Sequence, residues 1–167
     1  MEEFDIAIIG GGPAGIMAAI AASADLNIVL LEKNSSLGSK LLITGGGRCN
    51  ITNEKPIKKL LNSFHDKNFL KHSFYTFTNE MLLDLFRNRG LDFIVEDNNR
   101  VFPETEKSQD ILAILKYYLK DITIKYNFEV SDIKKEDNFI INNDIIAEKV
   151  IIATGGASFP KTGSTGD

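Results

Sequence analysis

A glycine-rich run near the N-terminus, GGGPAG, has a spacing that could bind phosphate. Gly10, Gly12 and Gly15 fit the pattern G-x-G-x-x-G, with Pro13 and Ala14 between the last two glycines. The first glycine permits a tight turn, the second lets the main chain approach a pyrophosphate, and the third allows a helix to pack closely on a strand. The N-terminus of the helix that follows would then attract the phosphates.

Glu32 supplies the second half of this pattern, because it ends the apolar run after the predicted helix. A carboxylate at this point can accept hydrogen bonds from a ribose diol and would repel a 2′-phosphate. The combination predicts a bound dinucleotide and favours NAD or FAD over NADP. The alternative is a chance glycine turn followed by a surface glutamate.

The elements that would position these residues form a βαβ unit. They are a buried strand at 4–9, a helix at 13–24 and a second strand at 27–31. Much later, the apolar run at 149–153 predicts a strand that ends at Thr154, Gly155 and Gly156 and can return beside the first glycine turn. The predicted fold is an α/β, Rossmann-like domain.

The middle of the chain is predicted to be largely helical, and a hairpin is expected before the returning strand. The further helices are predicted at 57–64, 68–77, 79–89 and 108–119, and the further strands at 93–96, 100–102, 123–126, 129–133 and 139–141. The last two strands flank the polar turn KKEDN, which is typical of a hairpin. Such a hairpin, in place of a second helix pair, resembles the FAD-binding members of the two-dinucleotide-binding-domain class. No change of composition marks a domain boundary.

Composition excludes several functional classes. The 167 residues have a formal net charge of -4, which argues against a nucleic-acid partner or an anionic membrane surface. One cysteine and two histidines predict neither a disulfide nor a metal site, and the single thiol fits a reducing cytoplasm. The N-terminus MEEFD is acidic, unlike a signal peptide, and no apolar run reaches the ~20 residues of a membrane helix. We expect a cytoplasmic protein.

Four segments, in this order, resemble one bacterial family. They are GGGPAGIMAA, GSKLLITGGGRCNITN at 38–53, RVFP at 100–103 and IIATGGASFPKTGSTGD at 151–167. The sequence is similar to the BaiN-like flavoproteins, also described as NAD(P)/FAD-dependent oxidoreductases or aminoacetone oxidase family FAD-binding enzymes. The resemblance covers essentially the whole chain. It implies FAD as the cofactor, NAD(P)H as a candidate electron donor and a small-molecule substrate.

The same resemblance places a loop at 40–53 along the flavin and the pyrophosphate. Lys40 would face the flavin, and Gly47, with the two glycines before it, would let the main chain pass close to the cofactor. Arg48 would supply a cation for the phosphates or the reduced ring, and Asn50 would hydrogen-bond ring or ribityl oxygens.

The sequence allows two interpretations for each of three candidate cofactor-binding residues, Cys49, Lys33 and Val130. Cys49 could be a reactive thiol beside a cation, but disulfide-reductase flavoenzymes use a cysteine pair, so a packed, flavin-adjacent Cys49 is favoured. Lys33 could approach the adenine ribose or phosphate, or be solvated. Val130 resembles the position whose main chain bonds adenine, or is an ordinary core valine. The sequence names no catalytic residue.

Members of this family are longer than this chain. We therefore expect residues 1–167 to be an incomplete FAD-binding domain, the N-terminal portion of a flavin-dependent oxidoreductase, inactive by itself. One alternative is a non-catalytic nucleotide-binding fragment. Another is a flavoprotein that acts on a macromolecule such as tRNA, against which the net charge argues. The sequence indicates neither the substrate nor the oligomeric state.

Overall fold

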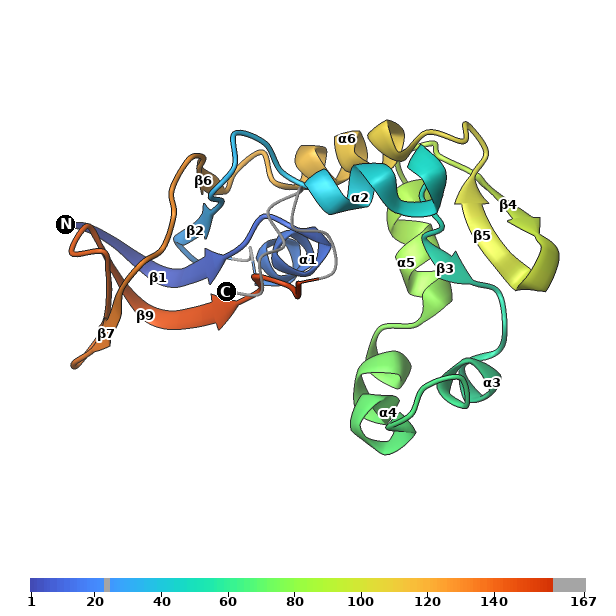
Figure 1. The fold of residues 1–167 in the computed structure, drawn as a ribbon, viewed down its shortest axis with the longest axis horizontal. Coiled ribbons are helices and arrows are strands. Elements are labelled where there is room, and N and C mark those ends of the chain that lie inside the picture. Colours follow the sequence, from blue (N-terminus) through green and yellow to red (C-terminus); the bar gives the residue numbers. More distant parts are fainter. Residues whose placement is uncertain (23–24, 158–167) are drawn as a thin grey trace. The chain divides into compact units, whose positions relative to one another are not determined.

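The computed structural model describes residues 1–22 and 25–157 (Figure 1). The chain divides into two compact units, which composition did not reveal. Unit 1 comprises Met1–Leu41 and Leu115–Asp167, and unit 2 comprises Leu42–Ile114. The helices α2 (Ser39–Ile43) and α6 (Ser108–Tyr118) carry the chain from one unit into the other.

Unit 1 is built on a six-stranded sheet with the order β6-β2-β1-β9-β8-β7. Its elements are β1 (Glu2–Ile9), α1 (Pro13–Ala22), β2 (Ile28–Leu31), β6 (Thr123–Lys125), β7 (Ile133–Lys135), β8 (Phe139–Ile141) and β9 (Ile145–Ile152). The strands β6, β2, β1 and β9 are parallel, whereas β8 and β7 form an antiparallel extension beside β9. The carboxyl ends of the four parallel strands therefore meet at one edge of the sheet.

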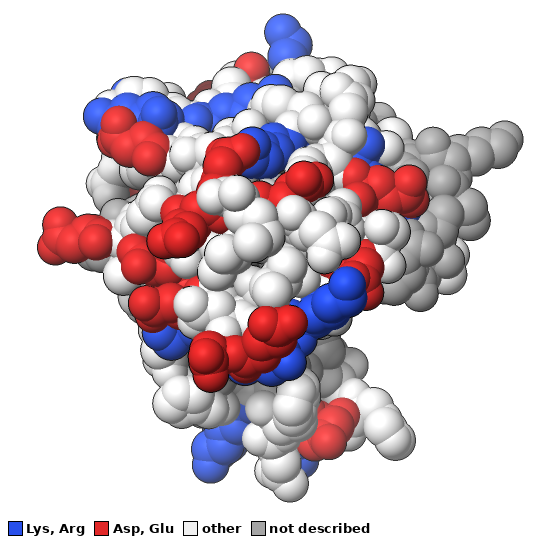
Figure 2. Space-filling model, turned by 90° about the vertical axis from the view of Figure 1, so that its left-hand side faces the viewer, with Lys and Arg blue, Asp and Glu red and all other residues white. Residues whose placement is uncertain are grey.

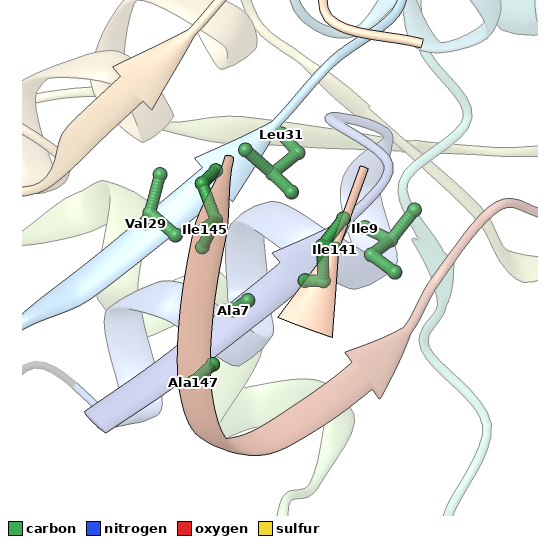
Figure 3. Packing of buried hydrophobic residues seen from close by; sticks show 7 residues of the cluster. All are labelled: Ala7, Ile9, Val29, Leu31, Ile141, Ile145 and Ala147. Carbon is green, nitrogen blue, oxygen red and sulfur yellow. The ribbon is translucent and has the colours of Figure 1, made fainter. Parts of the chain in front are cut away.

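The core of this unit follows from strands that are apolar on both faces. The buried cluster in Figure 3 takes alternate residues from neighbouring strands: Ala7, Ile9, Val29, Leu31, Ile141, Ile145 and Ala147. The intervening residues Ile8 and Leu30 are fully buried too. Continuous apolar runs of this kind are typical of parallel strands covered on both sides, which confirms the predicted α/β architecture.

Unit 2 contains the predicted helical insertion and a small antiparallel sheet with the order β3-β5-β4. Its elements are β3 (Thr52–Asn53), α3 (Ile57–Leu61), α4 (Lys67–Thr76), α5 (Asn79–Arg87), β4 (Phe93–Glu96) and β5 (Arg100–Pro103). Side chains cap two of the helices: Asp66 accepts from the main-chain nitrogen of Phe69, and Thr78 from that of Met81. These caps fix the starts of α4 and α5.

Three predicted elements need correction. The expected strand at 129–133 lies at Ile133–Lys135, so Val130 is in the irregular segment before it. The expected loop at 40–53 begins within α2, continues as a 3₁₀ turn at Thr44–Gly47, and ends in β3. The last strand starts at Ile145, earlier than expected, because residues 145–147 already pair in register with the start of β1. The segment GSTGD lies outside the described residues.

The face of the molecule drawn in Figure 2 carries side chains of both charges. Figure 2 shows acidic and basic side chains interspersed with neutral ones over one face. Within 1–22 and 25–157, no helix combines the length and the apolarity needed to cross a bilayer.

Candidate functional site

A cleft of about 370 Å³ opens at the carboxyl edge of the parallel strands in unit 1. Segments that follow β1, β2, β6 and β9 line it, together with the start of α2. These segments are 9–14, 31–34, 38–40, 128–131 and 153–155. The strand order places the returning strand β9 on the opposite side of β1 from β2, and open α/β sheets bind ligands at such a switch point.

The glycine turn after β1 has the geometry that phosphate binding needs. Gly10 has φ +107°, and a Cβ there would lie 2.5 Å from the carbonyl oxygen of Ala153 after β9, so only glycine fits. A Cβ on Gly12 would meet nothing within 4 Å, so that side of the turn is open space. Pro13 then opens α1, whose first N–H groups have no partner within the helix. The turn and helix end therefore fit a pyrophosphate.

Glu32 lies in the wall of this cleft and is only 6% exposed. Its Oε2 accepts from the main-chain nitrogen of Gly11 at 2.7 Å. Its Oε1 accepts from the main-chain nitrogen and the Nδ2 of Asn34, at 2.8 and 2.6 Å. A carboxylate has about four acceptor positions, so three of these bonds leave room for a ribose hydroxyl. Glu32 thus links the glycine turn to the end of β2.

Asn34 is the residue of this site that sequence reasoning missed. Its side chain and main chain together hold one carboxylate oxygen of Glu32. The signal was present, because asparagine often bonds groups two residues away. Its significance depends on the burial of Glu32, which the motif alone does not show.

The structure brings Val130 and Lys33 into the same cleft as Glu32. The main-chain nitrogen of Phe128 donates to the carbonyl oxygen of Glu32 at 3.0 Å, and this bond draws the segment before β7 against the end of β2. Val130 and Lys33 are both half-buried there. Their separate contacts with a nucleotide remain predictions.

Lys40 and the turn after β9 also meet at this edge. The Nζ of Lys40 donates to the carbonyl oxygen of Gly156 at 3.4 Å. Thr154 and Gly155 line the cleft with Ala14, so the returning strand ends beside the first glycine turn as predicted.

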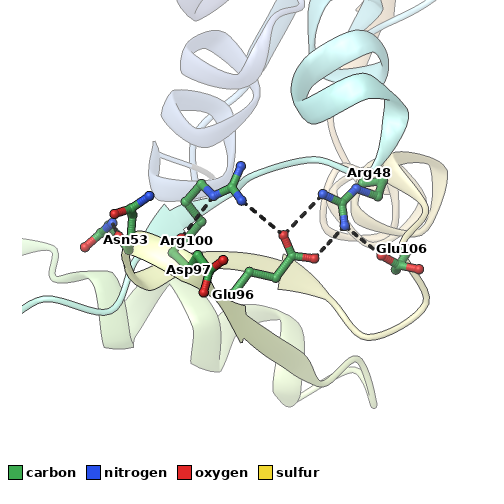
Figure 4. A network of polar contacts seen from close by, with 7 residues as sticks. Arg48, Asn53, Glu96, Asp97, Arg100 and Glu106 are labelled. Carbon is green, nitrogen blue, oxygen red and sulfur yellow. Dashed lines mark hydrogen bonds and ion pairs between the residues drawn. The ribbon is translucent and has the colours of Figure 1, made fainter.

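Arg48 lies in unit 2, in a cluster of charges shown in Figure 4. Its guanidinium donates to Glu96 at 2.6 and 3.3 Å and to Glu106 at 2.7 Å, and lies 4.2 Å above the ring of Phe102. Arg100 donates to Glu96 at 3.4 Å. The bond from Arg48 lowers the pKa of Glu96, and the bonds to both carboxylates raise the pKa of Arg48. Three of its five N–H groups are thus engaged, and its contact with a phosphate or flavin remains a prediction.

Cys49 and Asn50 follow Arg48 but differ in exposure. Cys49 is 1% exposed, and its burial raises the pKa of the thiol to about 11. The thiol is therefore protonated near neutral pH, which supports the packed interpretation over a reactive thiolate. Asn50 is exposed, and in the orientation that suits its neighbours its amide nitrogen donates to the carbonyl oxygens of Thr52 and Val101 at 3.0 and 3.3 Å. Gly47, with φ +91°, completes the turn.

The part of the chain that the structure describes holds no group of three or more side chains suited to a metal ion.

The comparisons with known proteins agree with this geometry. The family described as HI0933-like protein Rossmann domain matches residues 4–167. A 3-dehydro-bile acid delta(4,6)-reductase of Clostridium scindens is 32% identical over 170 residues, which cover 96% of this chain and 41% of that protein. A ribosomal RNA dihydrouridine synthase of Escherichia coli is 31% identical over 173 residues, which cover 99% of this chain and 42% of that protein.

A solved structure shares the fold at low identity. It is a 3-ketosteroid-delta4-(5alpha)-dehydrogenase from Rhodococcus jostii RHA1, with a TM-score of 0.66 and 16% identity over 93% of this chain and 46% of that one. The present chain spans about two fifths of the length of the curated relatives it matches.

Proposed function

Since the chain belongs to the family of HI0933-like protein Rossmann domains, we propose that it is the FAD-binding portion of a flavin-dependent oxidoreductase. The observation that carries this proposal is the meeting of three features in one cleft. They are the open side of Gly12, the N-terminus of α1 and the buried carboxylate of Glu32. Together they match the chemistry of an adenosine diphosphate.

The cofactor is FAD, which supplies the redox chemistry when bound by accepting and returning a hydride or two electrons. The residues of this chain bind and orient it. Gly12 and the first turn of α1 hold the pyrophosphate, and Glu32 accepts from the ribose. Val130 and Lys33 line the same cleft, where the main chain at Val130 would bind the adenine and Lys33 would add positive charge at the rim. Lys40 and the turn at 154–156, which a hydrogen bond joins, would extend the site from the phosphates toward the flavin.

The complete enzyme uses NAD(P)H as electron donor and reduces a small molecule in the cytoplasm. The relative from C. scindens, named for reducing a bile acid, supports a small-molecule substrate. The relative from E. coli, named for making dihydrouridine in ribosomal RNA, favours RNA as a second candidate. Both names describe reductions, so the flavin would have the same role in either case.

Titration of the purified chain with FAD, ADP, NAD and FMN tests the cofactor assignment. Flavin fluorescence and thermal stabilisation are the two readouts. We expect ADP and NAD to stabilise the protein, because both carry the adenosine diphosphate that fits the cleft. FAD should bind more tightly than either, because the proposed site extends toward the flavin, and FMN should have little effect. Stabilisation by FMN with none by ADP would overturn the placement of the nucleotide. Binding of NAD that is as tight as that of FAD would overturn the choice of cofactor.

A further inference from the structure

A locally basic segment lies within this acidic chain. Residues 55–77 contain five lysines and a single acidic residue, Asp66, whereas the whole chain has a formal net charge of -4. The segment forms α3, α4 and the turn between them, all within unit 2. The expectation of no nucleic-acid partner was based on the net charge of the whole chain, and that value does not show the local excess of lysines in this segment.

The charge of this segment is available at its surface. Lys58 and Lys59 of α3 and Lys67 and Lys71 of α4 are exposed. Among the described residues, none of these four forms an ion pair with an acidic side chain. The one acidic residue is used locally, because Asp66 caps α4 by accepting from the main-chain nitrogen of Phe69 at 3.0 Å.

Exposed aromatic rings accompany the lysines. Phe69 is 80% exposed and Tyr75 is 54% exposed, although large aromatic side chains in a folded unit are usually covered. Lys67, Lys71 and Tyr75 are spaced four residues apart on α4 and so form one stripe along the helix, whereas Phe69, two residues after Lys67, lies on another face of α4.

The two helices belong to one substructure. The ring of Phe64, in the turn after α3, packs against Phe74 of α4 with centroids 5.2 Å apart. The basic residues of both helices are therefore held on a common support. We call the set Lys58, Lys59, Lys67, Lys71 and Tyr75 the α3–α4 surface.

We propose that the α3–α4 surface docks single-stranded RNA. Unpaired lysines bind backbone phosphates and release counterions, and exposed aromatic rings stack on unpaired bases. Nothing in this interaction requires FAD, since the surface shares no residue with the cofactor cleft. An anionic membrane fits less well. An interfacial helix needs a continuous apolar face, but the residues around Phe69 on α4 include the polar Asn68, His72 and Ser73.

Fluorescence anisotropy with a labelled 20-nucleotide RNA of mixed sequence tests the proposal on the 167-residue chain. We expect binding to weaken by about 50-fold between 50 and 200 mM salt, the dependence of roughly four phosphate contacts on a single strand. The quadruple variant K58E/K59E/K67E/K71E should lose RNA binding while its affinity for FAD stays unchanged. A matched variant, K120E/K134E/K135E/K149E, has the same net charge and should bind RNA as the wild type does.

A second variant keeps the test decisive if four new glutamates impair folding. Y75A removes the exposed ring of the α3–α4 surface and leaves every charge in place, and we expect about tenfold weaker RNA binding. Equal RNA binding by the two quadruple variants, or no RNA binding by the wild type, would overturn the proposal. So would binding to phosphatidylserine–phosphatidylcholine vesicles that depends on these lysines when RNA does not bind. If the wild-type chain binds RNA but does not bind FAD, only the cofactor assignment is contradicted.

Discussion

The Oε2 atom of Glu32 lies 2.7 Å from the main-chain nitrogen of Gly11 and accepts its hydrogen bond. One carboxylate therefore stabilises the glycine turn after β1 and, in the proposed function, also binds a ribose at the end of β2. The two tasks are coupled, because the bond that fixes the turn also fixes the carboxylate. Substitutions at this site should affect folding and binding in proportions that reveal which task each residue performs.

Replacing Glu32 by Ala should impair both tasks. The buried N–H of Gly11 would lose its acceptor, which we expect to lower the free energy of unfolding by about 1–3 kcal/mol. Loss of the ribose contact should weaken FAD by about 10- to 100-fold. Urea denaturation and FAD titration measure the two effects, and E32Q, which keeps an acceptor oxygen, is the control. FAD binding by E32A as tight as that of the wild type would mean that the ribose lies elsewhere.

Asn34 should act on the ligand only through Glu32. We expect N34A to weaken ADP by about fivefold, because one carboxylate oxygen loses its side-chain donor at 2.6 Å. The same variant should bind 2′,3′-dideoxy-ADP as the wild type does, since that ligand has no ribose hydroxyl for Glu32. Calorimetry on the two proteins with the two ligands completes the cycle. An equal loss for both ligands would show that Asn34 supports the cleft in general.

Two glycines of the same turn should have different effects when replaced by Ala: one substitution should lower stability, and the other should weaken ligand binding. A Cβ on Gly15 would overlap the carbonyl oxygen of Gly10, so we expect G15A to destabilise the protein by about 1–3 kcal/mol. A Cβ on Gly12 meets only open space, so G12A should keep its stability. It should nevertheless bind FAD and ADP roughly tenfold more weakly, because its methyl group occupies the place of the pyrophosphate. Thermal melts with and without ADP separate the two results, and a stable G15A would contradict the close packing of α1.

The ion pair between Arg48 and Glu96 should make stability depend on pH. The pKa of Glu96 is lowered from its ordinary value of 4.5 because Arg48 donates to it. A carboxylate with a lowered pKa in the folded state stabilises the protein above its unfolded-state pKa, and this contribution is lost as the pH falls through the folded value. Denaturation midpoints between pH 6 and 3 should therefore fall less steeply in R48M than in the wild type.

Arg87 provides the control for this experiment. It pairs with Glu80 and Asp84 on the exposed face of α5, far from the GGGRCN turn in sequence. If R87M and R48M change the pH profile equally, the cluster around Arg48 has no special part in stability. High salt should reduce the difference between R48M and the wild type, because the pair is partly exposed.

Cys49 should react slowly with thiol reagents. Burial raises its pKa from the ordinary value of 9.0 to about 11, so near pH 7.5 the thiolate is about a hundredfold scarcer than in an unfolded chain. Alkylation by iodoacetamide should be correspondingly slow in the native protein and fast in urea. C49A should retain FAD binding. Fast alkylation of the native thiol near neutral pH would restore the reactive-thiol interpretation.

The sequence by itself determined the βαβ unit, the glycine turn and the carboxylate that follows β2. These features are local, because apolar runs, glycine spacing and strand ends are fixed by residues close together in the chain. It also predicted that the turn after β9 returns to the first glycine turn, which the strand order confirms.

Only the tertiary structure decided which side chains those elements bring together. Arg48 meets Glu96 across 48 residues of sequence, and that pairing depends on how β4, which ends at Glu96, packs within unit 2. Val130 reaches the cleft from irregular chain because Phe128 bonds the end of β2. Asn34 gains its role only because Glu32 is buried. Burial and long-range contacts set the energy of a polar group, and neither is a property of a short stretch of sequence.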